Sequence, residues 1–599
     1  MTPPANQFWQ DALHHPAARN TRYPRGKAMR NCMSCALRRL NTISALARAA
    51  LVASFKPMPD IVLTTLNAKY SHAAFGLRYL YANLGELQPR AVIAEFDINL
   101  RPLDIAEALL AREPRILGFG IYIWNVAQTT EVIAALRRVR PEILIILGGP
   151  EVSYETEGQK IVELADHVIT GEADLKFAEV CEQLLLPGRR SSPALTENPG
   201  SVETRPAAGL PKIIAAGVPD VSRLALPYDF YTEADLAHRI VYVEASRGCP
   251  FTCEFCLSSL DIPVRQVPLE PFLDAMQRLL DRGLKQFKFV DRTFNLNIAT
   301  SKALLKFFLA RHQPGMFFHF EMIPDRLPAE LRTVIAQFPP GSLQFEVGIQ
   351  TFNPAVGALI SRRQNYERLA DNFHFLRNET RVHIHADLIV GLPGETLESF
   401  GAGFDRLLAL GPQEIQVGIL KRLRGTPIIR HDAEWQMVYG APPPYEILQN
   451  KLLDFATLQR LRRFAKYWDL IGNSGNFVAV APLIWAAAGP GARQAPGDEK
   501  APPPSPFQAF LRLSDWLHAR LGRTDSIALA RLMEGLFEFL TRERGHDSGR
   551  VIEAFREDGR RTGRRETPAF LKESGTADRA DVRVRDRSLP KRQARHWAP

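Results

Sequence analysis

Short apolar runs alternate with segments of helical periodicity between residues 58 and 430, and this rhythm constrains the fold more than any other feature. In the first series the runs are rich in β-branched residues and lie at 61–65, 91–98, 116–123, 143–147 and 167–170. Strands that alternate with helices are typical of an α/β fold, a parallel sheet covered by helices. We therefore predict a doubly wound, Rossmann-like domain of about five strands over residues 58–186, with ligands beyond the carboxyl ends of the strands.

A second series of the same kind follows residues 187–235, whose first part is rich in Pro, Ser, Thr and Gly and which we expect to be a linker. Its strand candidates lie at 240–244, 286–290, 317–321, 343–347, 383–390 and 415–420. Six such units predict a barrel or partial (β/α)6 barrel over residues 236–430. Residues 431–540 contain helical stretches around a proline-rich break and indicate a small helical C-terminal domain.

The net charge of +10 belongs to the ends of the 599-residue chain. Residues 1–57 carry nine basic and one acidic side chain and residues 541–599 carry 16 and 10, so the stretch between them has a net charge of −4. We expect a basic, disordered N-terminal extension and a disordered charged tail, and we expect deletion of both to leave activity intact. A start at Met58 and a targeting segment are alternatives for residues 1–57. A nucleic-acid substrate is not expected, because the basic charge lies outside residues 58–540.

Three of the six cysteines, Cys249, Cys253 and Cys256, lie within eight residues directly after the first strand of the second series. Three thiolates in so short a loop can converge on one iron–sulfur cluster and leave one iron open to a small molecule. A zinc site, the alternative, requires a fourth cysteine or histidine at matching spacing, and none is placed for it. Cys32 and Cys35 form an isolated pair that we treat as incidental.

Six cysteines in 599 residues, three of them placed as ligands, indicate a reducing compartment and not a disulfide framework. The longest apolar runs are far shorter than the roughly 20 residues of a membrane-spanning helix. We therefore predict a soluble, cytoplasmic protein.

The cysteine spacing, with the aromatic Phe255 just before the third cysteine, resembles the signature of the radical S-adenosylmethionine (SAM) superfamily. The resemblance implies that Cys249, Cys253 and Cys256 hold a [4Fe–4S] cluster and that SAM chelates the fourth iron through its amino and carboxylate groups. It implies that the reduced cluster cleaves SAM to a 5′-deoxyadenosyl radical, with electrons from a donor such as flavodoxin or ferredoxin. The family's partial (β/α)6 barrel agrees with the six strands counted above.

Residues at the ends of barrel strands extend this resemblance. A glycine-rich turn after the fifth strand resembles the family's adenine-contact motif, which implies that Gly391 and Gly394 bind SAM. By the same analogy Glu346 and Gln350 face the ribose or methionine of SAM. Each of these side chains has an alternative role as a strand-end cap or ion-pair partner.

Two further polar residues are candidates for catalysis. Asp291 follows the second strand, where barrels point functional side chains, and we expect it to face the substrate, with a strand-end cap as its alternative. His383 and His385 alternate on the fifth strand and so point to one face, and His385 is a candidate acid or base, with a buried structural histidine as the alternative. The family's glycine-glycine-glutamate motif after strand two is absent.

Residues 58–185 resemble the cobalamin-binding domain that precedes the barrel in one large branch of the superfamily. The resemblance implies that Gly120, Gly148 and Gly149, at strand ends, let a flat macrocycle approach the backbone. The histidine-ligand motif D-x-H-x-x-G does not occur, and residues 67–72, ending in His72, occupy its place. We therefore expect cobalamin to bind without a protein histidine below the cobalt.

These features predict an enzyme that uses the cluster, SAM and cobalamin to methylate or rearrange an unactivated carbon in a small molecule. A tRNA methylthiotransferase, one alternative, normally holds a second cluster on three cysteines of its first domain, yet residues 58–200 contain only Cys181. A non-enzymatic iron–sulfur or cobalamin carrier, the other alternative, needs no SAM site, so the glycine-rich turn at residues 391–395 argues against it.

Overall fold

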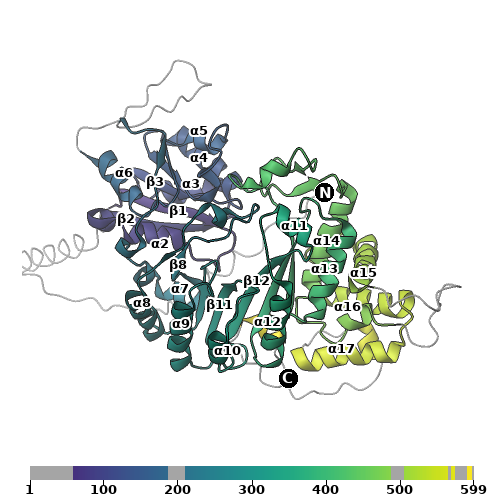
Figure 1. Cartoon of the computed structure of the whole chain (residues 1–599). Coiled ribbons are helices and arrows are strands. Elements are labelled where there is room, and N and C mark those ends of the chain that lie inside the picture. The colour runs from purple at the N-terminus through teal and green to yellow at the C-terminus, as the bar shows by residue number, and fades with distance from the viewer. Residues whose placement is uncertain (1–57, 187–208, 488–504, 564–567, 574–589, 597–599) are drawn as a thin grey trace, which may run out of the picture. The chain divides into compact units, whose positions relative to one another are not determined.

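The computed structural model of the chain describes residues 58–186, 209–487, 505–563, 568–573 and 590–596 (Figure 1). The expected basic extension at residues 1–57 lies outside the described residues. None of the described helices is both long enough and apolar enough to cross a bilayer.

The first domain is a parallel sheet with helices on both faces. Its strands run in the order β2-β1-β3-β4-β5-β6. Their bounds are β1 Ile61–Asn67, β2 Ala91–Asp97, β3 Ile116–Gly120, β4 Leu144–Gly148, β5 His167–Thr170 and β6 Ile213–Ala215. β1 lies inside the sheet and is buried along its whole length, which explains its continuous run of Ile, Val, Leu and Thr. The doubly wound fold is confirmed.

The helices of this domain form two separate apolar cores, one on each face of the sheet. α2 (Phe75–Ala82) and α6 (Lys176–Leu185) pack on one face. α3 (Pro102–Leu110), α4 (Val126–Val139) and α5 (Lys160–Leu164) pack on the other. The loops that follow β3 and β4 therefore meet at the carboxyl edge between the two layers, where the predicted ligand site lies.

Residues 209–235, expected to belong to a linker, are part of the folded unit. The sheet has a sixth strand, β6, which pairs with β5 from Val168 to Thr170. Beyond it lie short helical turns and α7 (Glu233–His238), and the rings of Tyr228 and Tyr231 are fully buried. The linker prediction is wrong for these residues because the buried aromatic rings anchor them to the core.

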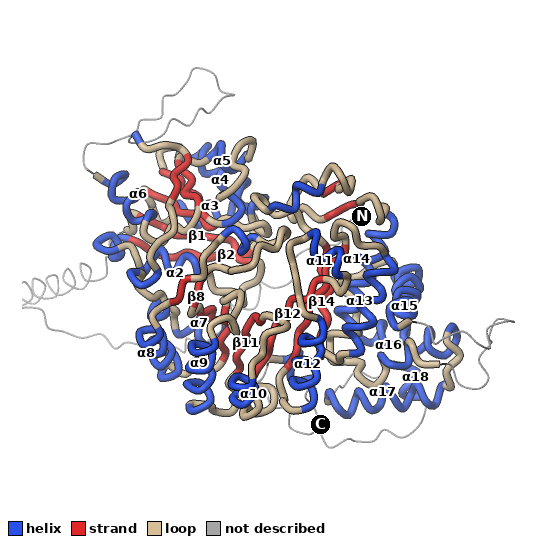
Figure 2. Tube along the Cα trace, viewed as in Figure 1, coloured by secondary structure: helices blue, strands red, loops and turns tan. Residues whose placement is uncertain are grey.

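The second sheet contains six parallel strands in chain order, from β7 to β14. Among the described residues, the edge strands β7 and β14 do not pair with each other. Figure 2 shows the six strands as neighbouring red segments. The strands are β7 Val241–Val243, β10 Gln286–Phe289, β11 Phe317–Met322, β12 Leu343–Gln350, β13 His383–Val390 and β14 Glu414–Ile419. The covering helices are α8 Leu269–Asp281, α9 Ile298–Ala310, α10 Ala329–Ile335, α11 Pro354–Leu359, α12 Tyr366–Asn378 and α13 Leu397–Ala409. The predicted partial barrel is confirmed.

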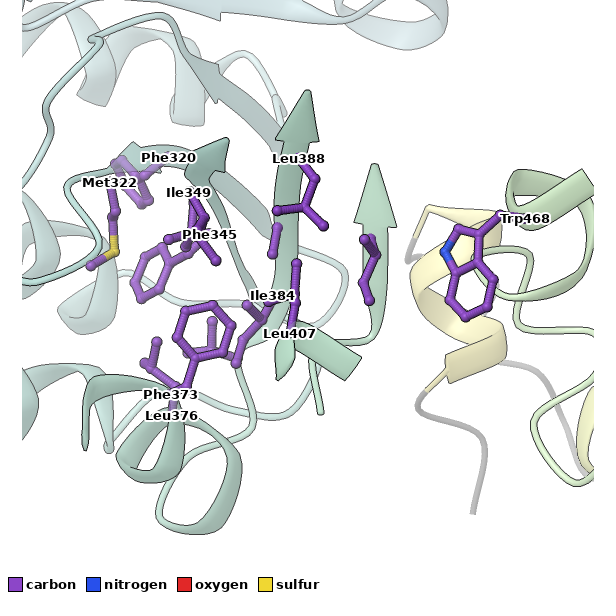
Figure 3. Close-up of a cluster of buried hydrophobic side chains, with 14 of the residues drawn as sticks. Phe320, Met322, Phe345, Ile349, Phe373, Leu376, Ile384, Leu388, Leu407 and Trp468 are labelled. Carbon is purple, nitrogen blue, oxygen red and sulfur yellow. The ribbon is translucent and has the colours of Figure 1, made fainter. Parts of the chain in front are cut away.

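The apolar core of the barrel lies between its strands and its helices. Figure 3 shows Phe320, Phe345 and Leu388 on the strands beside Phe373 of α12 and Leu407 of α13. Because side chains alternate along a strand, this arrangement turns the other half of the strand residues toward the barrel interior. Those inward residues are mostly polar.

The C-terminal region is helical, as predicted, and it shares one apolar core with the barrel. A short hairpin, β15 (Val438–Tyr439) and β16 (Ile447–Gln449), precedes α14 (Phe455–Ile471), α15 (Pro506–Leu521) and α16 (Leu529–Glu538). The ring of Phe404 on α13 lies 4.8 Å from that of Trp468 and 5.2 Å from that of Phe464. This region is a second layer on the barrel.

The segment 541–599 is not wholly a disordered tail, so that prediction is wrong for its described parts. α17 (Ser548–Thr562) buries Val551 and Phe555 completely, and Asp558 accepts hydrogen bonds from the backbone of residues 479 and 480. Two shorter helices follow, α18 (Ala569–Glu573) and α19 (Lys591–His596). Few apolar residues suffice here because α17 has a neighbouring layer to pack against.

Candidate active site

The three cysteines line one cavity of about 170 Å³ at the carboxyl ends of the barrel strands. They lie between two short antiparallel strands, β8 (Ser246–Arg247) and β9 (Arg265–Gln266). Gly248 opens the loop with a φ of +86°, and a Cβ there would lie 2.7 Å from the carbonyl oxygen of Asp261. The Cys249 amide donates to that same carbonyl at 2.9 Å, so the turn is fixed by its own backbone.

Glu254 fixes the middle of the cysteine loop. Its buried carboxylate accepts hydrogen bonds from Ser361 at 2.8 Å and from Arg430, and it lies 2.7 Å from Nε2 of His431. Its backbone amide donates to Ile360, and its carbonyl accepts from Ile428. The loop that carries the thiols is therefore held at Glu254 by two separate segments of the chain, residues 360–361 and 428–431.

The cysteine arrangement fits a cluster better than a single metal ion. A tetrahedral zinc ion with Zn–S bonds of about 2.3 Å would bring its sulfurs within about 4 Å of one another. Among the described residues, no group of three or more His, Cys, Asp and Glu converges on one such point. The three thiols instead line one cavity, which leaves room for a cluster with one iron open to a ligand.

Arg362 places a cation next to the cysteines, and sequence reasoning missed it. Its Nη1 lies 3.5 Å from Sγ of Cys253, and its Nη2 donates to the carbonyl of Gly348. It lines the cavity together with Arg292, whose guanidinium pairs with Glu321 at 3.0 Å. These guanidinium groups can balance the negative charge of cysteine thiolates and of a bound carboxylate.

Phe255 of the cysteine signature and two of the predicted SAM contacts, Glu346 and Gln350, line the same cavity. Gln350 adopts a φ of +72°, in the left-handed region that is costly for a residue with a side chain, and its buried Oε1 has no hydrogen-bond partner. A strained residue with an unsatisfied polar atom at the cysteine cavity fits a site for a polar ligand.

Gly391 and Gly394 have a different environment from the one predicted. Neither is among the residues lining the cysteine cavity. Gly391 has a φ of +91°, and a Cβ there would lie 2.6 Å from the side chain of Ile447. Gly394 has a φ of +79°, and a Cβ there would meet Leu359 at 2.7 Å. Glycine is therefore required at both positions by the turn and by its protein neighbours, and contact with SAM stays a prediction.

Asp291 lies buried beneath the cysteine loop and is not among the residues lining either neighbouring cavity. Its carboxylate accepts hydrogen bonds from the Ala245 amide at 3.0 Å and from the Ser246 hydroxyl at 2.6 Å. Burial raises the pKa of Asp291 to about 7, against the effect of these hydrogen bonds. The geometry corresponds to the strand-end cap, the alternative named for this residue.

The histidines of β13 are both held by carboxylates in the barrel interior. Nε2 of the fully buried His383 lies 2.8 Å from Glu414. His385 lies 3.5 Å from Asp387 and 3.8 Å from Glu414, so both histidines point toward one face as predicted. His385 is not among the residues lining the cysteine cavity.

Asp387 is a site residue that sequence reasoning did not select. It lines the cysteine cavity, and its buried Oδ1 has no hydrogen-bond partner. Burial and the nearby carboxylates of Glu346 and Glu321 raise its pKa well above the usual range. A protonated carboxyl group in this position can donate a hydrogen bond to a ligand. The alternation of β13 could have identified it, because it shares the inward face with His385.

A second cavity, of about 390 Å³, lies between the carboxyl edge of the first sheet and the loop that carries the cysteines. All three predicted cobalamin contacts, Gly120, Gly148 and Gly149, line it. A Cβ on Gly120 or Gly148 would meet protein atoms only at 3.5 Å or beyond, so their neighbours do not require glycine there. Gly149 is different, because a Cβ there would lie 2.5 Å from the carbonyl oxygen of Ile121. The open strand ends fit a flat ligand that approaches the backbone.

No histidine is among the residues lining this cavity. His72 instead lies 2.5 Å from the hydroxyl of Tyr242, through its Nδ1 atom. That no protein histidine lies below the cobalt stays a prediction.

Arg247 joins the two domains beside this cavity. Its guanidinium lies 2.9 Å from both Glu172 and Asp174 of the first domain, and its Nε atom lies 2.7 Å from Glu244 of the barrel. Arg424 makes a further link, at 2.9 Å to Glu151. The two cavities adjoin, because Ser258 and Arg292 line both.

The family comparisons match three parts of the chain. Residues 61–181 match the B12 binding domain, residues 243–407 match the Radical SAM superfamily, and residues 433–490 match a protein family of unknown function, DUF4080. The first range covers β1 to β5 and the second covers β10 to β13 of the barrel, whereas the third covers the hairpin and α14.

Two curated relatives have methyltransferase names. An uncharacterised methyltransferase of Pyrococcus horikoshii, PH0819, is 26% identical over 337 residues, which cover 55% of this chain and 71% of that protein. The cobalamin-dependent radical SAM methyltransferase TokK of Streptomyces tokunonensis is 24% identical over 337 residues, or 51% of this chain and 47% of TokK. The chain thus spans about half the length of the second relative.

A solved structure shares the fold. The cobalamin-dependent SAM radical enzyme OxsB, with aqua-cobalamin and SAM bound, aligns with a TM-score of 0.51 and 12% identity. The alignment covers 84% of each chain. The chain is therefore an enzyme of the radical SAM superfamily that carries a B12-binding domain, and its cofactors are a [4Fe–4S] cluster, SAM and cobalamin.

Proposed function

We propose that this enzyme transfers a methyl group from SAM to a carbon atom of a small molecule, with cobalamin as the carrier. The observation that carries the proposal is the shared wall between the two cavities, because Ser258 and Arg292 line both the cysteine cavity and the glycine-lined cavity. Cofactors in adjoining cavities can exchange a group without leaving the protein. When bound, the cluster and SAM supply a strong one-electron reductant and an alkyl radical source, and cobalamin supplies a methyl carrier.

The residues of the chain have separate tasks in this proposal. Cys249, Cys253 and Cys256 would hold the cluster, with Arg362 balancing the charge of Cys253 at 3.5 Å. Glu346 and Gln350 would orient SAM from the end of β12, as their position in the cavity allows.

The alternatives have less support. A methylthiotransferase normally carries a second three-cysteine cluster in its first domain, and Cys181, the one cysteine in residues 58–200, is buried in α6. A carrier protein would not require an unsatisfied glutamine oxygen at its cluster cavity, as Gln350 provides here.

We further propose a flavodoxin- or ferredoxin-type electron donor, a cytoplasmic location and no role for nucleic acid. Support for the location comes from the cysteine chemistry, since thiol ligands of this kind require reducing conditions. Support for excluding nucleic acid comes from the net charge of −4 of residues 58–540.

Anaerobic reconstitution of the full chain tests the proposal. We expect about four iron atoms per chain, as a [4Fe–4S] cluster requires, and release of 5′-deoxyadenosine from SAM after reduction with dithionite. Cys253→Ala should lose iron and SAM cleavage together, whereas Cys181→Ala, a change inside α6, should keep both. Full iron content in Cys253→Ala would contradict the cluster assignment.

A further inference from the structure

The interior of the barrel is polar, whereas the interior of a closed barrel is normally packed with branched apolar side chains. A cavity of about 380 Å³ occupies the end of the barrel opposite the cysteines. The polar residues that line it from the strands are Gln286 and Lys288 on β10, His319 on β11, Gln344 and Glu346 on β12, His385 on β13, and Glu414 and Gln416 on β14, with Ile240 and Phe317 beside them. A space walled in this way suits a polar ligand.

The C-terminal helix α19 forms another part of the wall. Arg592 pairs with Glu414 at 2.9 Å and with Asp469 at 3.0 Å, and the Gln593 amide donates to Gln344 at 2.5 Å. The last described turn of the chain therefore helps to enclose this space.

The carboxylates around the cavity have partners. Glu414 pairs with His383 at 2.8 Å and with Arg592 at 2.9 Å. Glu346 lies 2.9 Å from Nε2 of His319. Arg592 thus compensates the charge of Glu414, whereas Glu346 faces a histidine whose pKa is lowered by burial.

Lys288 is different, because no hydrogen bond or ion pair to its ammonium group occurs within the described part of the chain. It lies on the inward face of β10, in register with Tyr242 on one side and His319 on the other. Its neighbours Phe287 and Phe289 are buried on the opposite face. This half-buried ammonium group faces a cavity, and its electrostatic interactions with Glu321, Glu346 and Asp387 are longer-range than an ion pair, so it can still bind an anionic group of a ligand.

We propose that Lys288 binds the carboxylate or phosphoryl group of the substrate in this chamber, defined by the residues that line the 380 Å³ cavity. The inference rests on the proposed function and names its substrate class, a small molecule that carries an anionic group. Glu346 lines both this chamber and the cysteine cavity. A substrate anchored at Lys288 therefore extends past Glu346 toward the site where SAM is expected to bind.

Isothermal titration calorimetry on the full chain, reconstituted with its cluster and cobalamin, tests this inference. The probes are glutarate, which carries carboxylates, and glycerol 3-phosphate, which carries a phosphoryl group. At least one should bind to the wild type, and the probe that binds distinguishes the two anion types. Lys288→Met and Lys288→Gln should weaken that binding at least tenfold, and Lys288→Arg should restore part of it.

Lys285→Met is the matched control, because Lys285 is an exposed lysine three residues away whose ammonium group donates to the carbonyl of Pro314. It should bind the probe as the wild type does. Circular dichroism identifies any variant that fails to fold, and the Met and Gln variants provide two independent removals of the charge. Unchanged affinity in a folded Lys288 variant, or no binding of either probe to the wild type, would overturn the inference. Failure of wild-type protein to cleave SAM would refute the proposed function instead, whatever the calorimetry shows.

Discussion

Replacing Arg247 by alanine should destabilise the protein and weaken its hold on cobalamin. The Arg247 side chain is only 12% exposed, and its loss would leave the carboxylates of Asp174 and Glu244, which are 9% and 10% exposed, without their main counter-charge. It also removes a guanidinium 4.5 Å above the ring of Tyr79. Removal of one partner from a buried ion pair typically costs about 3–5 kcal/mol.

Two features place the expected cost near the lower end of that range. Arg265 still pairs with Glu172, and burial raises the pKa of Glu244, which allows that group to become neutral. We therefore expect a loss of about 3 kcal/mol in the free energy of unfolding of Arg247→Ala. Urea unfolding of the full chain measures it, and equilibrium dialysis with hydroxocobalamin measures the second effect.

The matched control is Arg278→Ala, which removes an ion pair to Asp229 between side chains that are 50% and 58% exposed. Exposed pairs of this kind contribute less than about 1 kcal/mol. Arg247→Lys keeps the charge and loses the forked geometry, so it should fall between the two. If Arg247→Ala shifts the urea midpoint no more than Arg278→Ala does, the account of the domain interface is wrong.

Three other predictions concern separate parts of the molecule. Gly120→Val should fold normally, because a Cβ there meets Thr65 only at 3.5 Å. The rest of the side chain would enter the cavity, so the variant should lose cobalamin in equilibrium dialysis. Undiminished retention would contradict the placement of cobalamin in this cavity. Phe555→Ala should lower the free energy of unfolding in urea by about 3–5 kcal/mol, because Phe555 is only 1% exposed. A negligible loss would restore the view that residues 541–599 are dispensable. Burial raises the pKa of Asp291 from 3.8 to about 7. The folded state therefore binds more protons than the unfolded chain between about pH 4 and 7, and the stability that this group contributes falls as the pH rises through that window. Asp291→Asn should remove that part of the pH dependence of the urea midpoint, and an unaltered profile would refute the assignment.

The fold was predictable wherever strands alternate cleanly with helices. All six barrel strands lie within three residues of their predicted ends, because buried Phe, Ile and Leu mark every second position. β6 was missed because a three-residue edge strand next to a segment rich in Pro and Gly has no periodicity of its own. α17 was missed because two buried apolar residues in a strongly charged helix resemble a solvated tail until a packing surface is known.

The candidate site was predictable only where its chemistry is local in sequence. The cysteine loop contains its ligands within eight residues, so spacing alone identifies it. Arg362 follows Cys253 by more than a hundred residues and reaches it through the loop after α11, and no sequence pattern marks that approach. Gly391 shows that a glycine can be explained in two ways, since a positive φ and the side chain of Ile447 account for it whether or not SAM contacts it.

Transfer of an isotopic label from SAM tests the central claim most directly. The full chain, reconstituted with iron, sulfide and hydroxocobalamin, would be incubated with SAM deuterated in its methyl group, a reductant and a bacterial small-molecule extract. We predict a metabolite that gains the labelled methyl group on carbon, only when cobalamin is present and not with Cys253→Ala. Cleavage of SAM without any transfer of the label, or transfer that is independent of cobalamin, would contradict the account.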